Sequence, residues 1–152
     1  MDELEELVDA LLPVVNGLRK LGVRHHVGGS VASSFHGATR STMDVDLVCE
    51  LTEDDIMQLI QSIGTDYYAS ETAMRDAVRR KGCFNLIHLP TSFKVDIFVS
   101  RQRPFDIESM ARASIEQLGE TRFVELPMAT AEDSIISKLE WYRLTGETSE
   151  RQ

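Results

Sequence analysis

The stretch of sequence that decides the fold is Val27-Gly-Gly-Ser-Val-Ala-Ser-Ser-Phe-His-Gly-Ala-Thr-Arg-Ser-Thr-Met-Asp-Val-Asp-Leu-Val-Cys-Glu50. It opens with two glycines and a serine at the end of the short β-prone run Val23–Val27. The segment Ser30–His36 can form two helical turns, which Gly37 would end as a C-cap. A polar loop then leads into Met43–Glu50, whose period-two alternation predicts a strand. We therefore expect a strand, a glycine turn, a short helix and a second strand in close succession.

The second of these strands carries two acidic side chains on one face. Asp44 and Asp46 lie on that face because successive side chains of a strand alternate, and the opposite face carries Val45, Leu47 and Cys49. The apolar face must be buried, so the two carboxylates point away from it. Neighbouring carboxylates repel each other, and a bound divalent cation is the usual way to offset the repulsion. The pair therefore predicts a metal site.

The glycine turn has the composition of a phosphate cradle. Gly28 and Gly29 let the backbone turn sharply and let a ligand approach without meeting a Cβ atom. Ser30 then begins a helix, where free N–H groups and the positive end of the helix dipole attract phosphate. A phosphate cradle followed by a carboxylate pair predicts a site for a metal-bound nucleoside triphosphate.

The motif Gly28–Ser30, followed after a gap by Asp44–Asp46, resembles the signature of the polymerase-beta-like nucleotidyltransferases. The chain more narrowly resembles the small prokaryotic nucleotidyltransferases related to abortive-infection toxins, through the intervening Gly37, Arg40 and Thr42. The resemblance covers residues 23–100 well and the C-terminal third more loosely. It implies an α/β (α+β) fold, nucleotidyltransferase-like, with a mixed β-sheet flanked by helices.

The same resemblance implies an activity and its cofactor. Members of that superfamily move a nucleoside monophosphate from a nucleoside triphosphate to an acceptor, using two Mg²⁺ ions and three carboxylates. It implies two Mg²⁺ here, with Mn²⁺ as a substitute, and gives catalysis and metal binding to Asp44 and Asp46. Nucleotide binding would fall to the phosphate cradle and to two nearby cations, namely Gly28, Gly29, Ser30, Arg40 and Lys138.

The third carboxylate is expected on a later strand. Cys83–Leu89 and Phe93–Ser100 read as two strands of a hairpin, joined through a proline-containing turn. In the second of them Asp96 shares a face with Lys94 and Phe98, opposite the aliphatic residues. A charge there could simply discourage aggregation at a sheet edge. By position, however, Asp96 resembles the third metal-binding and catalytic carboxylate of the family, which lies on a strand beside the one that carries the carboxylate pair. The matched alternation of Met43–Glu50 and Phe93–Ser100 also leads us to expect these two strands as neighbours in the sheet.

The helix expected near the C-terminus carries the last candidate residue. It runs from about Ala131 to Leu144 after the N-cap Thr130, and its predicted buried stripe is Ile135, Ile136, Leu139 and Tyr142. Lys138 lies off that stripe, as a lysine facing nucleotide phosphates would, and as any solvated lysine would. Trp141, on the same side, is more typical of a partly buried core residue than of a stacking surface.

The other elements follow from periodicity and capping. A helix over residues 2–20 contains Pro13, which predicts a kink or a break into two helices. His25, His26 and His36 are more typical of structural histidines than of ligands. The remaining expected elements are a helix from the Thr52 N-cap to Ile63, a short strand or turn at Asp66–Ser70, a helix at Glu71–Lys81, a short helix at Phe105–Ala111, and a hairpin of Ser114–Leu118 with Thr121–Leu126. The basic cluster that ends the Glu71–Lys81 helix is either a solvated helix terminus or a patch for triphosphate or acceptor, and the first is favoured.

Composition restricts the partners. The 152 residues fit one domain, with residues 145–152 as a disordered tail or the start of a further helix, and 42% apolar residues are ordinary for a soluble protein. No run could span a bilayer and the acidic start excludes a signal peptide, so with two thiols expected to stay reduced we expect a cytoplasmic location and no membrane contact. A net charge of −9 excludes broad non-specific nucleic-acid binding but leaves room for a local contact with a tRNA end or a protein partner.

Two functions from different classes remain open. The first is a magnesium-dependent nucleotidyltransferase whose acceptor is a tRNA, a protein hydroxyl or a small molecule. The second is a non-catalytic module that keeps the fold and acts as the nucleotidyltransferase-like half of a toxin–antitoxin pair. The three carboxylates favour the enzyme, because a silent module has no physical reason to keep clustered like charges.

Overall fold

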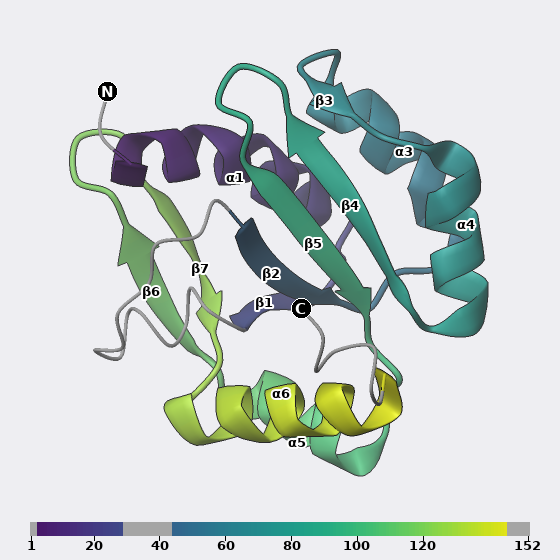
Figure 1. The fold of residues 1–152 in the computed structure, drawn as a ribbon. Coiled ribbons are helices and arrows are strands. Elements are labelled where there is room, and N and C mark those ends of the chain that lie inside the picture. Colours follow the sequence, from purple (N-terminus) through teal and green to yellow (C-terminus); the bar gives the residue numbers. More distant parts are fainter. Residues whose placement is uncertain (1–2, 29–43, 146–152) are drawn as a thin grey trace.

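The structure, a computed structural model, describes residues 3–28 and 44–145, with only the backbone at positions 141, 142, 144 and 145 (Figure 1). The described elements are α1 (Glu3–Lys20), β1 (His25–Gly28), β2 (Asp44–Cys49), α3 (Glu53–Ile63), β3 (Tyr67–Tyr68), α4 (Glu71–Arg80), β4 (Cys83–His88), β5 (Lys94–Val99), α5 (Pro104–Arg112), β6 (Ser114–Leu118), β7 (Val124–Met128) and α6 (Ala131–Thr145). Within these residues seven strands form one sheet, in the order β3-β4-β5-β2-β1-β7-β6.

The sheet is mixed. Strands β2 and β5 pair in parallel, as do β1 and β7, whereas the β1–β2, β3–β4, β4–β5 and β6–β7 pairs are antiparallel. Both predicted hairpins are present, although the second strand of the later one is Val124–Met128 rather than Thr121–Leu126. The predicted α/β fold with a mixed sheet flanked by helices is confirmed.

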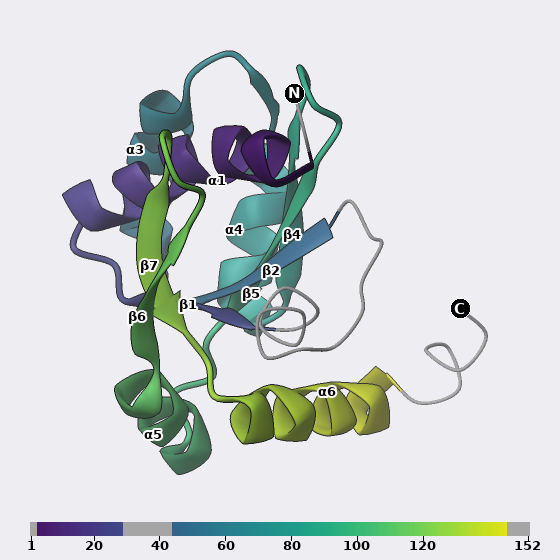
Figure 2. The same cartoon turned by 90° about the vertical axis from the view of Figure 1, so that its left-hand side faces the viewer.

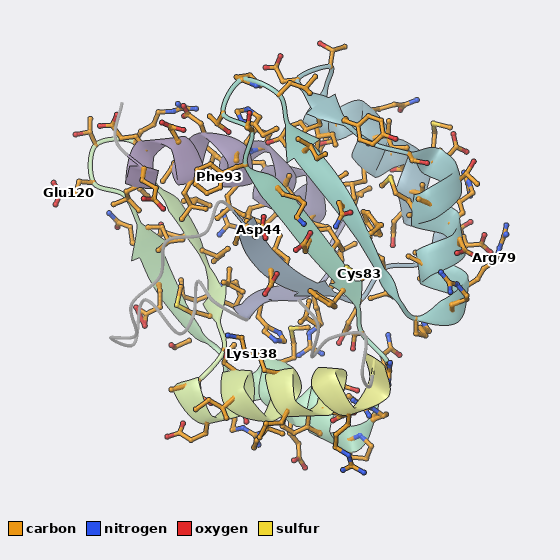
Figure 3. All side chains as sticks on the ribbon, in the orientation of Figure 1. Asp44, Arg79, Cys83, Phe93, Glu120 and Lys138 are labelled. Atoms are coloured by element: carbon orange, nitrogen blue, oxygen red, sulfur yellow. The ribbon has the colours of Figure 1, made fainter. Side chains whose placement is uncertain are left out.

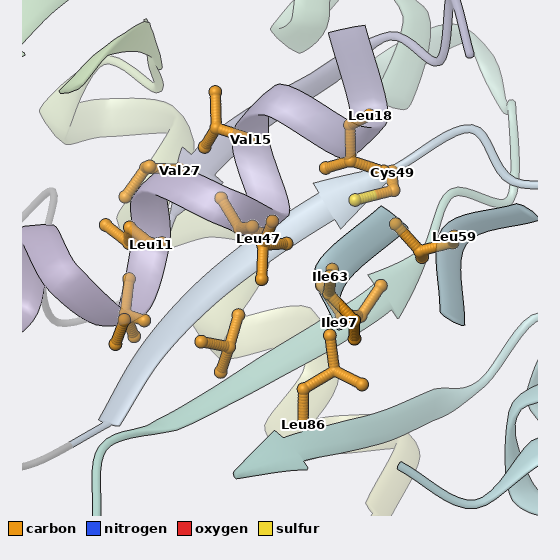
Figure 4. Close-up of a cluster of buried hydrophobic side chains, with 14 of the residues drawn as sticks. Leu11, Val15, Leu18, Val27, Leu47, Cys49, Leu59, Ile63, Leu86 and Ile97 are labelled. Carbon is orange, nitrogen blue, oxygen red and sulfur yellow. The ribbon is translucent and has the colours of Figure 1, made fainter. Parts of the chain in front are cut away.

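One face of the sheet is covered by helices and closes the core. Helices α1, α3 and α4 lie together on that face, while α5 and α6 lie near the lower end of the sheet in both views (Figures 1 and 2). Leu11, Val15 and Leu18 of α1 pack with the inward residues Leu47 and Cys49 of β2 and Ile97 of β5 (Figure 4). Because the aliphatic sides of β2 and β5 are sealed in this way, their polar sides are left for the site.

Pro13 does not break the first helix in two. Helix α1 is continuous across it, with fully buried Leu11 and Val14 on either side. Proline removes one backbone hydrogen bond, but burial of an amphipathic face supplies most of a helix's stability in a folded protein. Packing against the sheet therefore holds the helix together at this position.

The predicted buried stripe of the last helix is wrong for every member whose side chain is described. Ile135, Ile136 and Leu139 are 55%, 46% and 60% exposed, and among the described side chains of α6 the buried ones are Asp133 and Ser134. Helix α6 is held by its first turn: Arg112 donates two hydrogen bonds to Asp133, at 2.8 and 2.9 Å. An ion pair, not the apolar stripe, therefore sets which side of α6 faces the protein.

Candidate active site

Four side chains form a compact set on the polar face of β2 and β5. The parallel register places Asp44 opposite Lys94 and Asp46 opposite Asp96. All four are partly buried, and the residues between them point into the core, as period-two alternation requires. Figure 3 shows Asp44 on β2 and Lys138 on α6 below it. The predicted neighbourhood of the two aspartate-bearing strands is confirmed.

The electrostatics of this set are those of crowded carboxylates. Burial, then Asp96 and Asp44, raise the pKa of Asp46 to about 6, against an opposing effect of the Lys138 ammonium. Burial also raises the pKa of Asp96, which Lys94 and a hydrogen bond from Asn85 oppose. Asp46 and Asp96 are hydrogen-bonded to each other. One proton held between two carboxyl groups relieves part of the repulsion that three adjacent negative charges would otherwise create.

Two further side chains hold the carboxylates in place. Asn85 on β4 donates from Nδ2 to Oδ1 of Asp96 at 2.5 Å. The Nζ atom of Lys94 lies 3.9 Å from Oδ2 of Asp44 and 3.9 Å from Oδ1 of Asp96. Neither residue was assigned a role from the sequence. The signal for both was available, because the hairpin register and the alternation of β5 place them beside Asp96.

The chemistry of this set fits magnesium. Three carboxylates offer hard oxygen donors, which Mg²⁺ prefers, and the raised pKa of Asp46 shows that its negative charge is poorly compensated. As they stand, no three His, Cys, Asp or Glu side chains in the described part of the chain are arranged to hold an ion together. The metal-binding roles of Asp44, Asp46 and Asp96 stay predictions.

A cavity of about 360 Å³ opens between this face of the sheet and helices α5 and α6. Gly28, Asp46 and Val48 line it from the sheet, and Ser137 and Lys138 line it from α6. Gly28 is buried, and a Cβ atom built on it would meet nothing within 4 Å among the described residues. The cavity therefore brings one predicted metal ligand, one predicted cradle residue and the predicted phosphate lysine to one space.

The other predicted residues divide into two groups. Gly29, Ser30 and Arg40 lie outside the described residues, as do His36 and the expected Ser30–His36 helix. His25 and His26 are both buried, and burial is the main cause that lowers the pKa of each, to about 4 for His26. Their Nδ1 atoms contact the Val23 carbonyl at 2.9 Å and the Met110 sulfur at 3.1 Å, respectively. These contacts favour the structural interpretation of both histidines.

The basic cluster at the end of α4 separates into two kinds of residue. Arg75, Arg79 and Arg80 form ion pairs with Glu71, Glu53 and Asp76 on the surface. Only Lys81 of that cluster lines the cavity, where Arg101 and Arg103 join it. Arg101 and Arg103 carry no periodic signal that would predict them at the site, because both lie in the loop after β5.

The comparisons with known proteins agree with this fold. The sequence matches no protein-family model, and no curated protein is similar enough to count as a relative. Solved structures do match, among them the crystal structure of a putative nucleotidyltransferase from Thermotoga maritima. The two chains are 15% identical, with a TM-score of 0.55 over 99% of this chain and 93% of that one. The fold of the chain is therefore nucleotidyltransferase-like.

Within the described residues, no helix is long and apolar enough to cross a membrane.

Proposed function

We propose that the protein is a magnesium-dependent nucleotidyltransferase that moves a nucleoside monophosphate from a nucleoside triphosphate to an acceptor hydroxyl. One observation carries the proposal: Asp46 faces Asp96 across the β2–β5 pair, with Asp44 beside them, and Asp46 lines the same cavity as Lys138. Clustered carboxylates cost stability unless cations offset them, and one ammonium at 3.9 Å from two of the three leaves negative charge over, which favours a working metal site over a passive module.

The residues of the site divide the work by their chemistry. Asp44, Asp46 and Asp96 would hold the Mg²⁺ ions, which when bound neutralise the triphosphate and lower the pKa of the acceptor hydroxyl. Gly28, Gly29 and Ser30, with Arg40 and Lys138, would hold the phosphate oxygens. This division places negative ligands on the sheet and cations around the triphosphate.

Asp96 is suited to handle the proton of the acceptor. The acceptor oxygen forms a bond to the α-phosphorus while the bond from that phosphorus to the bridging oxygen breaks, and pyrophosphate leaves. Asp96 accepts the hydroxyl proton or orients the hydroxyl, because a buried carboxylate with a raised pKa is a better base than an exposed one. Asn85 keeps the Asp96 carboxyl group in one orientation during that step.

Transfer of label tests the proposal. The protein is incubated with each α-labelled nucleoside triphosphate, Mg²⁺ and a cell extract, and the labelled product is identified as tRNA, protein or small molecule. We expect labelling by the parent and none by Asp96→Asn, which keeps the shape and removes the charge. Asp54→Asn is the matched control, since Asp54 is an exposed carboxylate on α3. Full transfer by Asp96→Asn would exclude the three-carboxylate mechanism.

The second candidate is a non-catalytic module of a toxin–antitoxin pair. The exposed apolar residues Ile135, Ile136 and Leu139 on α6 favour it, because an uncovered apolar helix face is typical of a protein contact. An enzyme can also carry such a face, so these exposed residues do not distinguish the two candidates. The labelling experiment does. No transfer by the parent with any triphosphate, together with a stable complex from a co-expressed neighbouring protein, would favour the module.

A further inference from the structure

Lys94 places a positive charge where a metal-binding site does not need one. Its ammonium lies 3.9 Å from a carboxylate oxygen of Asp44 and 3.9 Å from one of Asp96, so it interacts with one carboxylate on β2 and one on β5. Asp46, the third carboxylate, is hydrogen-bonded to Asp96 and not to the lysine. Two of the three carboxylates thus contact this ammonium, which stands on the same face of β5 as Asp96.

We infer that Lys94 is the resident counter-ion of the carboxylate set and competes with a divalent cation for Asp44 and Asp96. The inference rests on the proposed function, since it concerns the same site. Its consequence is that Lys94, and not the carboxylates alone, sets how tightly the protein takes up metal in the absence of nucleotide.

The competition follows from charge and reach. A divalent cation on the oxygens of Asp44 and Asp96 must displace the ammonium or meet its positive charge at close range, and both reduce metal affinity. The side chain of Lys94 is 40% exposed, so its flexible stem lets the ammonium move into water when it is displaced. A neutral residue here would leave the same carboxylates with no internal competitor.

The counter-ion also couples metal uptake to the triphosphate. Metal alone must overcome the ammonium, whereas a metal–triphosphate complex brings negative oxygens that can accept the displaced lysine. We therefore expect the site to bind Mg²⁺ weakly by itself and to fill when the nucleotide arrives. This order limits occupation of the carboxylates by ions that arrive without substrate.

Manganese titration tests the inference without any turnover. Free Mn²⁺ is measured by electron paramagnetic resonance as it is added to the protein at low salt, without nucleotide. We expect Lys94→Met to bind Mn²⁺ about tenfold more tightly than the parent, because one close positive charge is gone. Lys20→Met is the matched control, since Lys20 is exposed at the end of α1, and we expect it to change affinity less than about twofold. Lys94→Arg keeps the charge and should stay close to the parent.

A second measurement, the melting temperature, distinguishes failure of the inference from failure of the proposed function. Without metal, Lys94→Met should melt at a lower temperature than the parent, and saturating Mn²⁺ should remove the difference. Lys94→Gln keeps a polar end group and serves as a second neutral variant in case Lys94→Met does not fold. It should show the same gain in affinity for Mn²⁺. If the parent binds Mn²⁺ and both neutral variants bind it equally or more weakly, the inference is wrong and the proposed function stands. If neither the parent nor any variant binds Mn²⁺, the inference and the proposed function are both wrong.

Discussion

Asn85 and Asp96 are joined across the β4–β5 pair by a 2.5 Å hydrogen bond from the amide Nδ2 to the carboxylate Oδ1. The bond fixes the rotation of a carboxyl group whose other partners are Asp46 and Lys94. A carboxylate held in this way cannot turn away from the site when its charge is offset. Asn85 is therefore a positioning residue for Asp96.

Replacing Asn85 should slow the transfer step more than it weakens substrate binding. We expect Asn85→Ala to lower kcat about tenfold or more, as loss of a partner behind a metal ligand typically does, with little change in the KM for the triphosphate. The pKa of Asp96 should rise further, because the amide hydrogen bond lowers it. Steady-state kinetics over a range of pH measure both effects. An equal loss in kcat for Asn85→Gln, which restores an amide, would show that orientation is not the cause.

The second prediction concerns the dependence of stability on pH in metal-free buffer. The pKa of Asp46 is raised from 3.8 to about 6 in the folded protein, so the folded state holds this proton more tightly than the unfolded chain. Stability from this group is therefore full below about pH 4 and is lost as pH rises toward 6. The loss is at most about 3 kcal/mol, since one pKa unit corresponds to 1.36 kcal/mol.

The difference between the parent and Asp46→Asn isolates that contribution from other titrations. Chemical unfolding at several pH values between 4 and 7.5 should show the variant gaining stability relative to the parent as pH rises. Added Mg²⁺ should stabilise the parent at pH 7.5 and have much less effect on the variant. A constant difference between the two proteins across this range would mean that Asp46 is not perturbed as described.

The third prediction concerns the cations expected to bind triphosphate. Lys138 lines the cavity with Asp46, and Arg40 lies outside the described residues. Alanine at either position should weaken binding of the Mg²⁺–triphosphate complex about tenfold while leaving kcat nearly unchanged, because a phosphate contact acts in the ground state as well. Lys20→Ala serves as the control for loss of charge. Calorimetric titration decides, and a residue whose alanine variant binds as tightly as the parent has no part in the site.

The acidic face of the site could be predicted from the sequence because alternation is a local rule. Asp44, Asp46 and Asp96 each lie between aliphatic residues, and a strand with one buried face leaves no choice of where they point. That β2 and β5 are neighbours was predicted from their matched alternation together with the resemblance, and the sheet confirms it. The same alternation placed Lys94 beside Asp96, although its contact with Asp44 depends on the β2–β5 register.

The last helix could not be predicted in the same way. Its sequence has an apolar stripe, and a stripe normally marks the side that packs on the core. The side that faces the protein is instead set by the long-range contact between Arg112 on α5 and Asp133 on α6. Neither residue has a periodic pattern that predicts the pair, and the loop cations Arg101 and Arg103 were missed for the same reason.

The last prediction follows from that ion pair, which holds the helix that carries Lys138. Asp133 is buried, and the Arg112 hydrogen bonds lower its pKa. Arg112→Ala leaves a buried carboxylate without its partner, so we expect a melting temperature lower by roughly 5 °C at pH 7. Arg75→Ala, which breaks an exposed pair with Glu71, should have far less effect on the melting temperature.

Triphosphate affinity of Arg112→Ala should fall toward that of Lys138→Ala, because the first turn no longer fixes α6 against the cavity. The double variant Arg112→Ala/Asp133→Ala should recover part of the lost stability, since it buries no unpaired charge, but should not recover the affinity. Recovery of both by the double variant would mean that this ion pair does not position Lys138.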